Sequence, residues 1–483
     1  MEKSEQIFKQ IEKTSKKSKL EVFVVGGYVR DVLLGRKEKP DIDCVVVGSG
    51  IEFARAFDET MKKKGSLVEF PDFDTARYVI AEESEGIEIE FAGARSESYR
   101  SVSRKPEVKP ADLNSDLSRR DFTVNAMAAP VKIFTKKITK AALKKALVDP
   151  YHGYSDLEDK ILRTPLEPDS TFSDDPLRMM RAIRFAGQLG FYLQKETLES
   201  IYRNADRIKI ISGERIQEEL IKMMSVAQPS VCLGLLFHTK LLDRILPEVS
   251  ALDGVEEVYG HQHKNNLVHS FKVVDNLAEY TTDPWLRLAG LLHDIGKAGT
   301  KQFVPKLGWT FHGHEHLGKK QLYGVAKRLK FSKEKTDYIA KLIRWHLQPI
   351  SLMDEGITDS AVRRLIVTMG EQISDLLMLG RSDITTGNPH KKERRLKNYD
   401  RLKKRVEEVV EKDKLLAFQS PFRGDEIMKS CGLKPGPTVG KIKTAIEEAI
   451  LDGVIPNEYE AAKGYFEKIK NEHLKAAADW EKA

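Results

Sequence analysis

Two aspartates at the start of an apolar run are the first residues of this chain whose type and spacing could do chemistry. Asp41 and Asp43 open DIDCVVVG, which has the pattern of a buried β-strand. Because side chains alternate along a strand, both carboxylates share one face, about 6–7 Å apart. Such a pair can hold a divalent cation. An isolated pair of this kind more often caps a turn.

A Gly-Gly turn upstream favours the metal site. In VFVVGGYVRDVLLG, Gly26 and Gly27 follow an apolar strand and precede a helix pattern that contains Arg30. Without a Cβ, their backbone amides can approach a phosphate closely. Gly48-Ser49-Gly50 also follows a strand, but Phe53 stands where a dinucleotide fingerprint needs its third glycine. A Rossmann site is therefore not expected.

The segment RRDFTVNAMA combines charge with apolar residues that indicate burial. Arg119, Arg120 and Asp121 open it, and Asn125 could hydrogen-bond a ribose or a phosphate. The alternative is a buried Arg-Asp bridge that holds two parts of the chain together.

The segment DDPLRMMRAIRFAGQLGF has the pattern of a helix start, with acidic residues before a proline. Asp175 and Arg178 are three residues apart, so they can share one face and offer acceptors and a planar donor fork. A simple helix cap is the alternative. Arg181 and Arg184 continue the stripe, and we expect them to face phosphate.

Histidines and aspartates recur on helix patterns further along the chain. The candidate ligands are His269, His293, Asp294, His314, His346 and Asp383. The order of His269, the pair in LLHDIGK and Asp383 resembles an HD-type phosphohydrolase site. Imidazole and carboxylate ligands suit Mn²⁺, Fe²⁺, Ni²⁺ or Mg²⁺, and a bound water would attack a phosphate ester. His314 and His346 could complete a second metal position, and Lys297 is placed to contact phosphate. The remaining histidines of this region are expected at the surface or behind the ligands, namely His261, His263, His312 and His316.

The elements that must position these residues change character along the chain. Residues 22–130 alternate short β-branched runs with polar loops, whereas apolar residues recur with the helical period from about Ser155 onward. The sequence predicts an α+β protein, with an N-terminal mixed α/β head followed by all-α neck, HD and tail domains. The expected domains are 1–150 (head), 151–250 (neck), 251–390 (HD) and 391–483 (tail).

Composition sets further bounds. The chain has 483 residues, 41% of them hydrophobic, and a net charge of +7, which permits a polyanionic partner. Its three cysteines are far apart in the sequence and predict neither a disulfide framework nor a cysteine zinc site. No apolar run approaches the roughly 20 residues that span a bilayer, and the lysine-rich start lacks the apolar region of a signal peptide. We therefore expect a soluble cytoplasmic protein with no membrane partner.

Taken in order, GGYVRD with DIDCVVVG, RRDFTVNAMA and DDPLRMMRAIRFAGQLGF resemble the class II tRNA nucleotidyltransferases and bacterial poly(A) polymerases over residues 20–250. The resemblance implies a template-independent polymerase that uses two metal ions. Asp41 and Asp43 would bind Mg²⁺. Glu90 in EIEFAGAR would be the third carboxylate, with Glu88 as the alternative because it points the same way.

The resemblance also implies the nucleotide contacts. The RRD motif would contact sugar and phosphates, and Asp175 and Arg178 would replace a template by pairing with CTP or ATP. The nucleotide-binding set that it implies is Gly26, Gly27, Arg30, Arg120, Asp121, Asn125, Asp175, Arg178, Arg181 and Arg184.

The tail resembles the C-terminal segment of HD-containing CCA-adding enzymes from Arg423 to Gly453. Backbone amides of Gly436 to Gly440 could meet an RNA phosphate at a helix N-terminus. A basic run extends from Lys391 to Arg405. Its residues Lys391, Lys392, Arg394 and Arg395 predict either a footing for the tRNA elbow or a solvated charged helix.

These features favour a CCA-adding enzyme that acts on tRNA with CTP and ATP and carries an accessory HD phosphohydrolase. A poly(A) polymerase and a split CC- or A-adding enzyme are alternatives on the same scaffold, and base choice among them is expected to depend on the loop from Ala92 to Ser118. An HD phosphohydrolase that uses the head only to bind RNA is the alternative of another class. Intact Asp41 and Asp43 argue against it.

Overall fold

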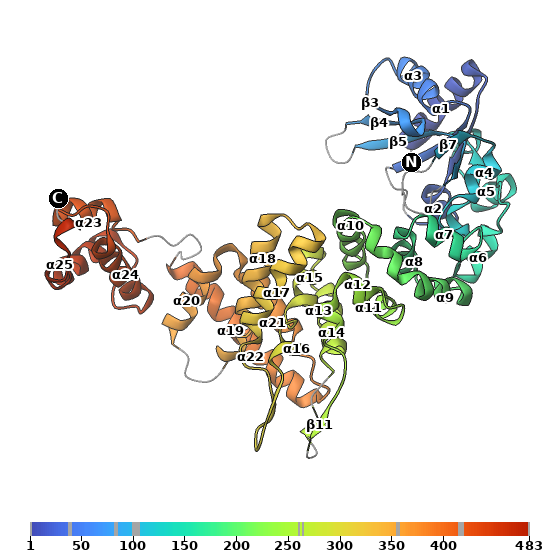
Figure 1. Ribbon diagram of the computed structural model, residues 1–483. Coiled ribbons are helices and arrows are strands. Elements are labelled where there is room, and N and C mark those ends of the chain that lie inside the picture. Colours follow the sequence, from blue (N-terminus) through green and yellow to red (C-terminus); the bar gives the residue numbers. More distant parts are fainter. Residues whose placement is uncertain are drawn as a thin grey trace. The chain divides into compact units, whose positions relative to one another are not determined.

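A mixed α/β part comes first in the chain and helices follow it (Figure 1). The chain divides into two compact units, Met1–Pro247 and Glu248–Ala483. This order of elements confirms the predicted fold class, whereas the finer division into four domains stays a prediction. The computed structural model describes residues 2–36, 41–81, 86–98, 107–258, 261–262, 265–353, 358–413 and 420–481.

A six-stranded sheet forms the core of the head, with strand order β3-β4-β5-β2-β1-β8. β2 and β5 run parallel, and the other neighbouring strands of this sheet run antiparallel. The β-branched runs that the sequence marks as strands all lie in it. The strands are β1 (Glu21–Val25), β2 (Asp41–Val47), β3 (Ser66–Phe70), β4 (Thr75–Ile80), β5 (Ile87–Gly93) and β8 (Ala128–Pro130).

Helix α3 packs on β4 and β5 because its apolar stripe faces them. Phe57 of α3 lies with its ring centroid 5.2 Å from that of Tyr78 on β4, and both side chains are fully buried. The Asp74 carboxylate accepts hydrogen bonds from the first two backbone amides of α3. This carboxylate therefore occupies the helix N-terminus at Gly48-Ser49-Gly50, where a dinucleotide fingerprint would bind phosphate. The other elements of the head are α1 (Glu2–Ser18), α2 (Gly27–Leu33), α3 (Gly50–Thr60), β6 (Arg95–Ser98), β7 (Glu107–Pro110), α4 (Leu113–Ser118), α5 (Lys140–Ala146) and α6 (Gly153–Asp159).

Helix α8 is the central element of the neck and packs against α10 and α11. The helix start expected in the segment Asp174 to Arg178 is present: Asp174 ends α7, Asp175 is extended, and α8 begins at Leu177. Proline disfavours helical backbone in the residue before it, which explains the break ahead of Pro176. The elements are β9 (Ile161–Leu162), α7 (Pro168–Asp174), α8 (Leu177–Leu189), β10 (Tyr192–Leu193), α9 (Lys195–Asn204), α10 (Gly213–Met224), α11 (Pro229–His238) and α12 (Leu241–Ile245).

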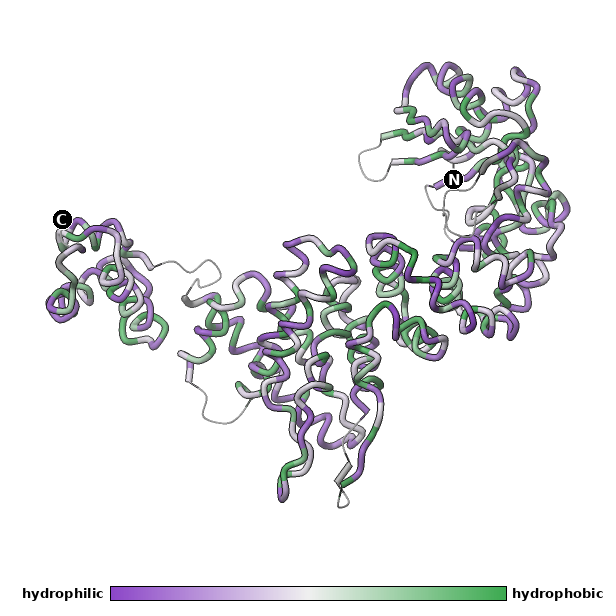
Figure 2. The backbone as a smooth tube through the Cα atoms, in the orientation of Figure 1, coloured by the Kyte–Doolittle hydropathy of each residue, from purple (hydrophilic) through white to green (hydrophobic). Residues whose placement is uncertain are grey.

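The second compact unit is built almost entirely of amphipathic helices, along which the tube in Figure 2 changes repeatedly between purple and green. Two short hairpins, β11–β12 and β13–β14, were not expected from the sequence. No helix within the described ranges is both long and apolar enough to cross a membrane. The elements before the tail are α13 (Pro247–Ser250), β11 (Glu257–Val258), β12 (His261–Gln262), α14 (Asn266–Ala278), α15 (Pro284–Leu292), α16 (Lys297–Thr300), β13 (Gln302–Val304), β14 (Gly308–Thr310), α17 (His314–Leu329), α18 (Lys333–Trp345), α19 (Gln348–Ser351), α20 (Asp359–Met369), α21 (Ile373–Ser382) and α22 (Pro389–Asp413).

The tail has its own apolar core, formed by α23 (Gly424–Cys431), α24 (Pro437–Leu451) and α25 (Tyr459–Lys475). Glu481 occupies the N-terminus of α24: the Thr438 amide and hydroxyl donate to the Glu481 carboxylate at 2.8 and 3.0 Å. Of the amides from Gly436 to Gly440 that were expected to meet an RNA phosphate, the Thr438 amide is therefore already used within the protein. A carboxylate from the end of the chain therefore takes the place expected for a phosphate, because a helix N-terminus favours any anion.

Candidate active sites

Four carboxylates gather on two neighbouring strands of the head. Asp41 and Asp43 lie on the exposed face of β2, and the parallel register with β5 places Asp41 opposite Glu88 and Asp43 opposite Glu90. Asp43 and Glu90 line one cavity of about 300 Å³. The shared face predicted for the two aspartates is present.

Electrostatics distinguish the two glutamates. Burial raises the pKa of Asp43, and the charges of Asp41 and Glu88 raise it further while Arg120 opposes them. Burial and the Asp43 charge likewise raise the pKa of Glu90. Arg77 is paired more closely with Glu88 than with Glu90: its Nε lies 2.6 Å from Glu88 Oε1 and its Nη2 lies 3.8 Å from Glu90 Oε2. These like charges fit a hard divalent cation with oxygen ligands, and Glu90 as the third ligand, with Glu88 as the alternative, stays a prediction.

The Gly-Gly turn lies beside these carboxylates. Gly26 has a φ of 68°, and a Cβ there would lie 3.0 Å from Arg120 Nη1 and 3.6 Å from Asp43 Oδ2. Gly27, Arg30, Asp41 and Asp43 line a second cavity of about 160 Å³. The turn therefore needs glycine both for its backbone conformation and for space.

A buried network joins the RRDFTVNAMA segment to α8. Arg30 donates to the Asn125 side-chain oxygen at 2.6 Å, and Asn125 donates to Asp121 at 3.0 Å. Arg181 then donates to Asp121 through Nε and Nη2 at 2.9 and 2.6 Å. Burial by itself raises the pKa of Asp121, but the Arg181 charge and the Asn125 hydrogen bond lower it to about 2. The bridging alternative for this segment is thus present, and the Asn125 amide is used within the protein.

Asp175 and Arg178 line the same cavity of about 300 Å³ as Asp43. Asp175 also accepts a hydrogen bond from the Leu177 amide at 3.2 Å, and Arg178 Nη2 donates to the main-chain oxygen of Arg119 at 2.7 Å. The capping alternative and the cavity-facing placement therefore coexist.

Arg184 departs from the predicted arginine stripe. Its Nε donates to Glu219 on α10 at 2.6 Å, and both side chains are buried. It is absent from the residues that line the cavity. The stripe stops at Arg181 because α8 turns its next arginine into the core of the neck.

The cavity also holds Arg119 of the predicted RRD motif and Arg95, which was not predicted as a site residue from the sequence. Arg95 Nη1 donates to the Thr75 hydroxyl at 2.9 Å, which holds it at the rim of the sheet. Its position a few residues after Glu90 in EIEFAGAR was a usable signal. Part of the loop from Ala92 to Ser118, residues 99–106, lies outside the described residues.

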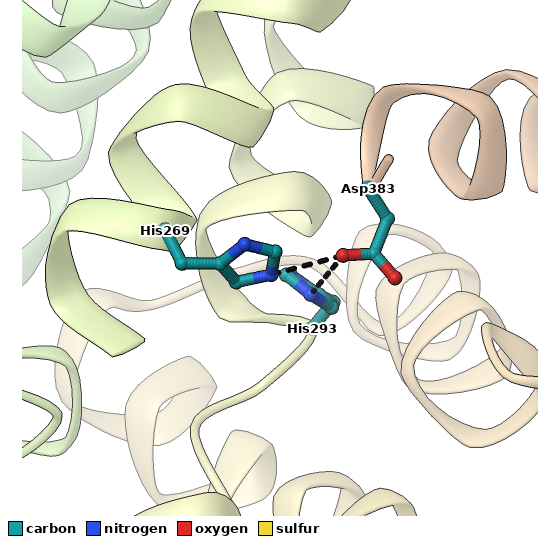
Figure 3. A group of neighbouring side chains, drawn as sticks. All are labelled: His269, His293 and Asp383. Atoms are coloured by element: carbon teal, nitrogen blue, oxygen red, sulfur yellow. Dashed lines mark ion pairs between the residues drawn. The ribbon is translucent and has the colours of Figure 1, made fainter. Parts of the chain in front are cut away.

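The second site brings the six predicted ligands together from different helices. His269 Nε2 lies 2.9 Å from Asp383 Oδ1, and His293 Nε2 lies 3.6 Å from the same oxygen (Figure 3). The figure shows His269 coming from α14, His293 from the end of α15, and Asp383 from the end of α21. Asp294 lies among three of the imidazoles: its oxygens lie 3.1 Å from His293 Nε2, 3.3 Å from His314 Nε2 and 3.7 Å from His346 Nε2.

The tautomers of three imidazoles point to a cation. The Nδ1 atoms of His293, His314 and His346 each lie 2.7–2.8 Å from the main-chain oxygen three residues earlier, so Nδ1 carries the hydrogen. Their Nε2 lone pairs therefore converge, and those of His314 and His346 face each other at 3.2 Å. His293 Nε2 and Asp294 Oδ1 are buried without a hydrogen-bond partner among the described residues. Among the described residues, two groups of three have ligand atoms close enough to share a metal ion: His269, His293 and Asp383, and His293, Asp294 and His346.

Without a metal, protons must occupy the place of the cation between these side chains. Burial lowers the pKa of His293, but Asp294 and Asp383 more than compensate and raise it to about 10. Burial and the neighbouring His293 lower the pKa of His346 to about 4. Lys297 Nζ lies 2.6 Å from Asp294 Oδ2 and adds a fixed positive charge. The exposed His312 and His316 stand outside the ligand set, as expected, whereas His263 and the side chain of His261 lie outside the described residues.

The fold and the two sites define a class of protein: a nucleotidyltransferase head with paired strand carboxylates, a helical neck and an HD metal centre. Three family models match the chain: a poly A polymerase head domain over residues 22–163, a probable RNA- and SrmB-binding site of polymerase A over 190–252, and an HD domain over 266–408. The chain belongs to the class II family of CCA-adding tRNA nucleotidyltransferases and poly(A) polymerases that carry an HD domain.

Individual relatives agree with this assignment. The multifunctional CCA protein of Pseudomonas fluorescens (strain Pf0-1) is 34% identical over 327 residues, which cover 65% of this chain and 72% of the relative. The A-adding tRNA nucleotidyltransferase of Aquifex aeolicus (strain VF5) is 32% identical over 69% of this chain and 39% of its own length. The crystal structure of the Bacillus stearothermophilus CCA-adding enzyme in complex with CTP has a TM-score of 0.62 at 22% identity, over 97% of this chain and 98% of that chain, and shows the same fold.

Proposed function

We propose that this protein adds CMP and AMP to the 3′ ends of tRNA without a nucleic-acid template. The observation that carries the proposal is a single cavity lined by Asp43, Asp175 and Arg178. It joins a carboxylate of the reaction centre to a pair that can hydrogen-bond the edge of a nucleobase. The printed names of the relatives, CCA protein and A-adding nucleotidyltransferase, support this reaction class.

The carboxylates Asp41, Asp43 and Glu90 hold Mg²⁺ in this proposal. When bound there, Mg²⁺ supplies activation of the RNA 3′-hydroxyl and neutralises the triphosphate and its pyrophosphate leaving group. Gly26 and Gly27 leave room for phosphate beside these carboxylates. Arg95, Arg119, Arg120 and Arg181 line the cavity and supply positive charge.

Asp175 and Arg178 select the base. Arg178 is held by the main-chain oxygen of Arg119 and Asp175 by Arg215, whose Nη2 lies 3.4 Å from Asp175 Oδ2. Both are thus oriented before a nucleotide arrives, so a mismatched base leaves buried polar atoms unpaired.

The test uses three tRNA transcripts, ending at the discriminator base, at C and at CC, with CTP and ATP offered separately and together. A CCA-adding enzyme completes all three transcripts to CCA and stops. Addition of AMP to the CC transcript alone, or of CMP alone, would make it a split-activity enzyme, and long adenosine tails on unrelated RNA would make it a poly(A) polymerase. No incorporation with any transcript would leave the head as an RNA-binding platform.

We also propose a second activity, in which the HD site hydrolyses phosphate esters. The convergence of four Nε2 atoms on Asp294 and Asp383 carries this proposal. A divalent transition metal such as Mn²⁺ or Ni²⁺ held there supplies Lewis-acid activation of water. Hydrolysis of 2′,3′-cyclic and terminal phosphates, measured with each metal in turn, tests it. A function in tRNA processing also places the protein in the cytoplasm in this proposal.

A further inference from the structure

One arginine of the basic helix α22 reaches the HD site. The cavity beside the metal ligands has a volume of about 190 Å³. Arg395 lines it, although the sequence grouped this residue with a charge run on the outside of the protein. The polar and charged residues that line the cavity include His269, Lys297, Asp383, Thr385, Thr386 and Arg395.

Helical periodicity explains why Arg395 lies there. α22 buries a stripe formed by Tyr399, Leu402, Val406 and Val409, and it packs on α20 and α21. Arg395 precedes Tyr399 by four residues, so it belongs to the same stripe one turn earlier. The Tyr399 hydroxyl packs so closely on α21 that a Cβ on Gly380 would lie 2.3 Å from it. The stripe is therefore fixed against α21, whose end carries Asp383, and its first residue faces the cavity instead of the core.

The two cations of the cavity differ in how they are paired. Lys297 is committed to Asp294, with 2.6 Å between Nζ and Oδ2. Arg395 makes neither an ion pair nor a hydrogen bond within the described part of the chain. A guanidinium in this state can donate two parallel hydrogen bonds to a phosphoryl group. Arg394, the preceding residue of the same helix, is exposed like Arg395 but does not line the cavity.

We propose that Arg395 binds the phosphoryl oxygens of the substrate in the HD site. The proposal rests on the phosphohydrolase function proposed above and adds the residue that recognises the anion. The proposal gives one positive charge of α22 a role in phosphate-ester binding that its neighbours do not share. If the basic run served as a footing for tRNA instead, all of its positive charges would contribute similarly.

The first experiment measures binding without catalysis. Inorganic phosphate is titrated calorimetrically into the Mn²⁺-loaded full chain, into Arg395→Ala and into the matched control Arg394→Ala. Loss of a charge-assisted hydrogen bond predicts at least about tenfold weaker phosphate binding for Arg395→Ala and less than twofold change for Arg394→Ala. Equal affinities in the two variants, or no phosphate binding by the parent, would overturn the proposal.

A second variant separates recognition from folding. Arg395→Lys keeps the positive charge but loses the paired donors, so we expect intermediate phosphate affinity and an unchanged unfolding temperature. Added guanidinium ion should restore part of the affinity of Arg395→Ala and leave Arg394→Ala unaffected. If Arg395→Ala and Arg395→Lys bind phosphate as the parent does, Arg395 has no role in recognition.

Kinetics then distinguish this inference from the function on which it rests. With p-nitrophenyl phosphate, Arg395→Ala should raise KM at least about tenfold and should change KM more than it lowers kcat. The reason is that the Arg395 guanidinium binds the phosphoryl group equally in the ground state and in the transition state. A fall in kcat with an unchanged KM counts against the proposal. If the parent hydrolyses nothing with any divalent metal yet binds phosphate through Arg395, the phosphohydrolase function fails and the anion site stands.

Discussion

The head site and the HD site both suit divalent cations, yet they are organised in opposite ways. Among the described residues, the groups of three or more potential ligands whose atoms all lie within 4.8 Å of one another belong to the HD site. In the head, the carboxylates are spread along β2 and β5 in register. His293 and Asp294 are almost completely buried, whereas Glu90 is 39% exposed in its side chain.

The chemistry of the ligands explains this difference. Imidazoles can converge in a buried core because each keeps a hydrogen bond at Nδ1, to the main chain for His293, His314 and His346 and to the Thr385 hydroxyl for His269. Carboxylates repel one another and lose hydration when buried, so three of them cannot be packed together in advance without a cation. Magnesium also retains water and is commonly bound together with substrate phosphates. An open carboxylate site therefore suits a polymerase, and a preformed imidazole site suits a resident metal.

The largest effect should come from removing one carboxylate of the head. We expect Asp43→Asn to lower the rate of CMP and AMP incorporation at least about a thousandfold, since metal stabilisation of the transition state supplies several kcal/mol. Phosphate-ester hydrolysis by the same protein and its tRNA affinity should change less than twofold. The matched control is Glu59→Gln, a carboxyl change on the exposed surface of α3. A parallel loss of hydrolysis would show that the two sites are not independent.

The reciprocal change should abolish hydrolysis and spare polymerisation. In His293→Ala/Asp294→Ala we expect metal-dependent hydrolysis to fall at least about a hundredfold, because two ligands are lost. Nucleotide addition should stay within twofold, since the two sites belong to different compact units. Metal content and unfolding temperature are measured on the same sample. Full hydrolytic activity in this variant would remove the HD ligands from the reaction.

The two sites should differ in the pH dependence of metal binding. The pKa of His293 is about 10 in the metal-free protein, so metal binding must release its proton at neutral pH. Proton and metal compete for Nε2, and the affinity of the HD site for Mn²⁺ should therefore rise about tenfold per pH unit, or about a hundredfold from pH 6 to pH 8. Mn²⁺ titrations of the Asp43→Asn variant at three pH values measure this slope. A flat profile would contradict a protonated His293.

Base selection should show the smallest effect. Arg178→Ala should reduce discrimination against UTP and GTP by about tenfold, since one hydrogen bond to a base edge contributes about 1–3 kcal/mol. Arg203→Ala is the control, because Arg203 pairs with Asp169 and does not line the cavity. Misincorporation is measured on the CC transcript. A slower reaction with unchanged selectivity would reduce Arg178 to a residue that braces the head against the neck.

Short local patterns predicted much of the candidate sites. The strand with Asp41 and Asp43, the Gly-Gly turn and the six histidines and aspartates that gather in the second unit were found because alternation, glycine and metal-ligand chemistry leave local traces. Arg184 was misplaced because a stripe of arginines on one helix does not reveal which of them meets a glutamate on another. The occupant of the α24 N-terminus was missed for a similar reason: Glu481 lies 43 residues from Thr438.

The sequence by itself determined the family, most of the element types and the residue types at each site, because these depend on spacing over a few residues. Tertiary structure alone decided which charges are already satisfied within the protein. Asn125 is committed to Arg30 and Asp121, Lys297 is committed to Asp294, and Arg395 faces a cavity. Electrostatic and hydrogen-bonding energies depend on distances between side chains, and folding sets these distances between residues that are remote in the sequence.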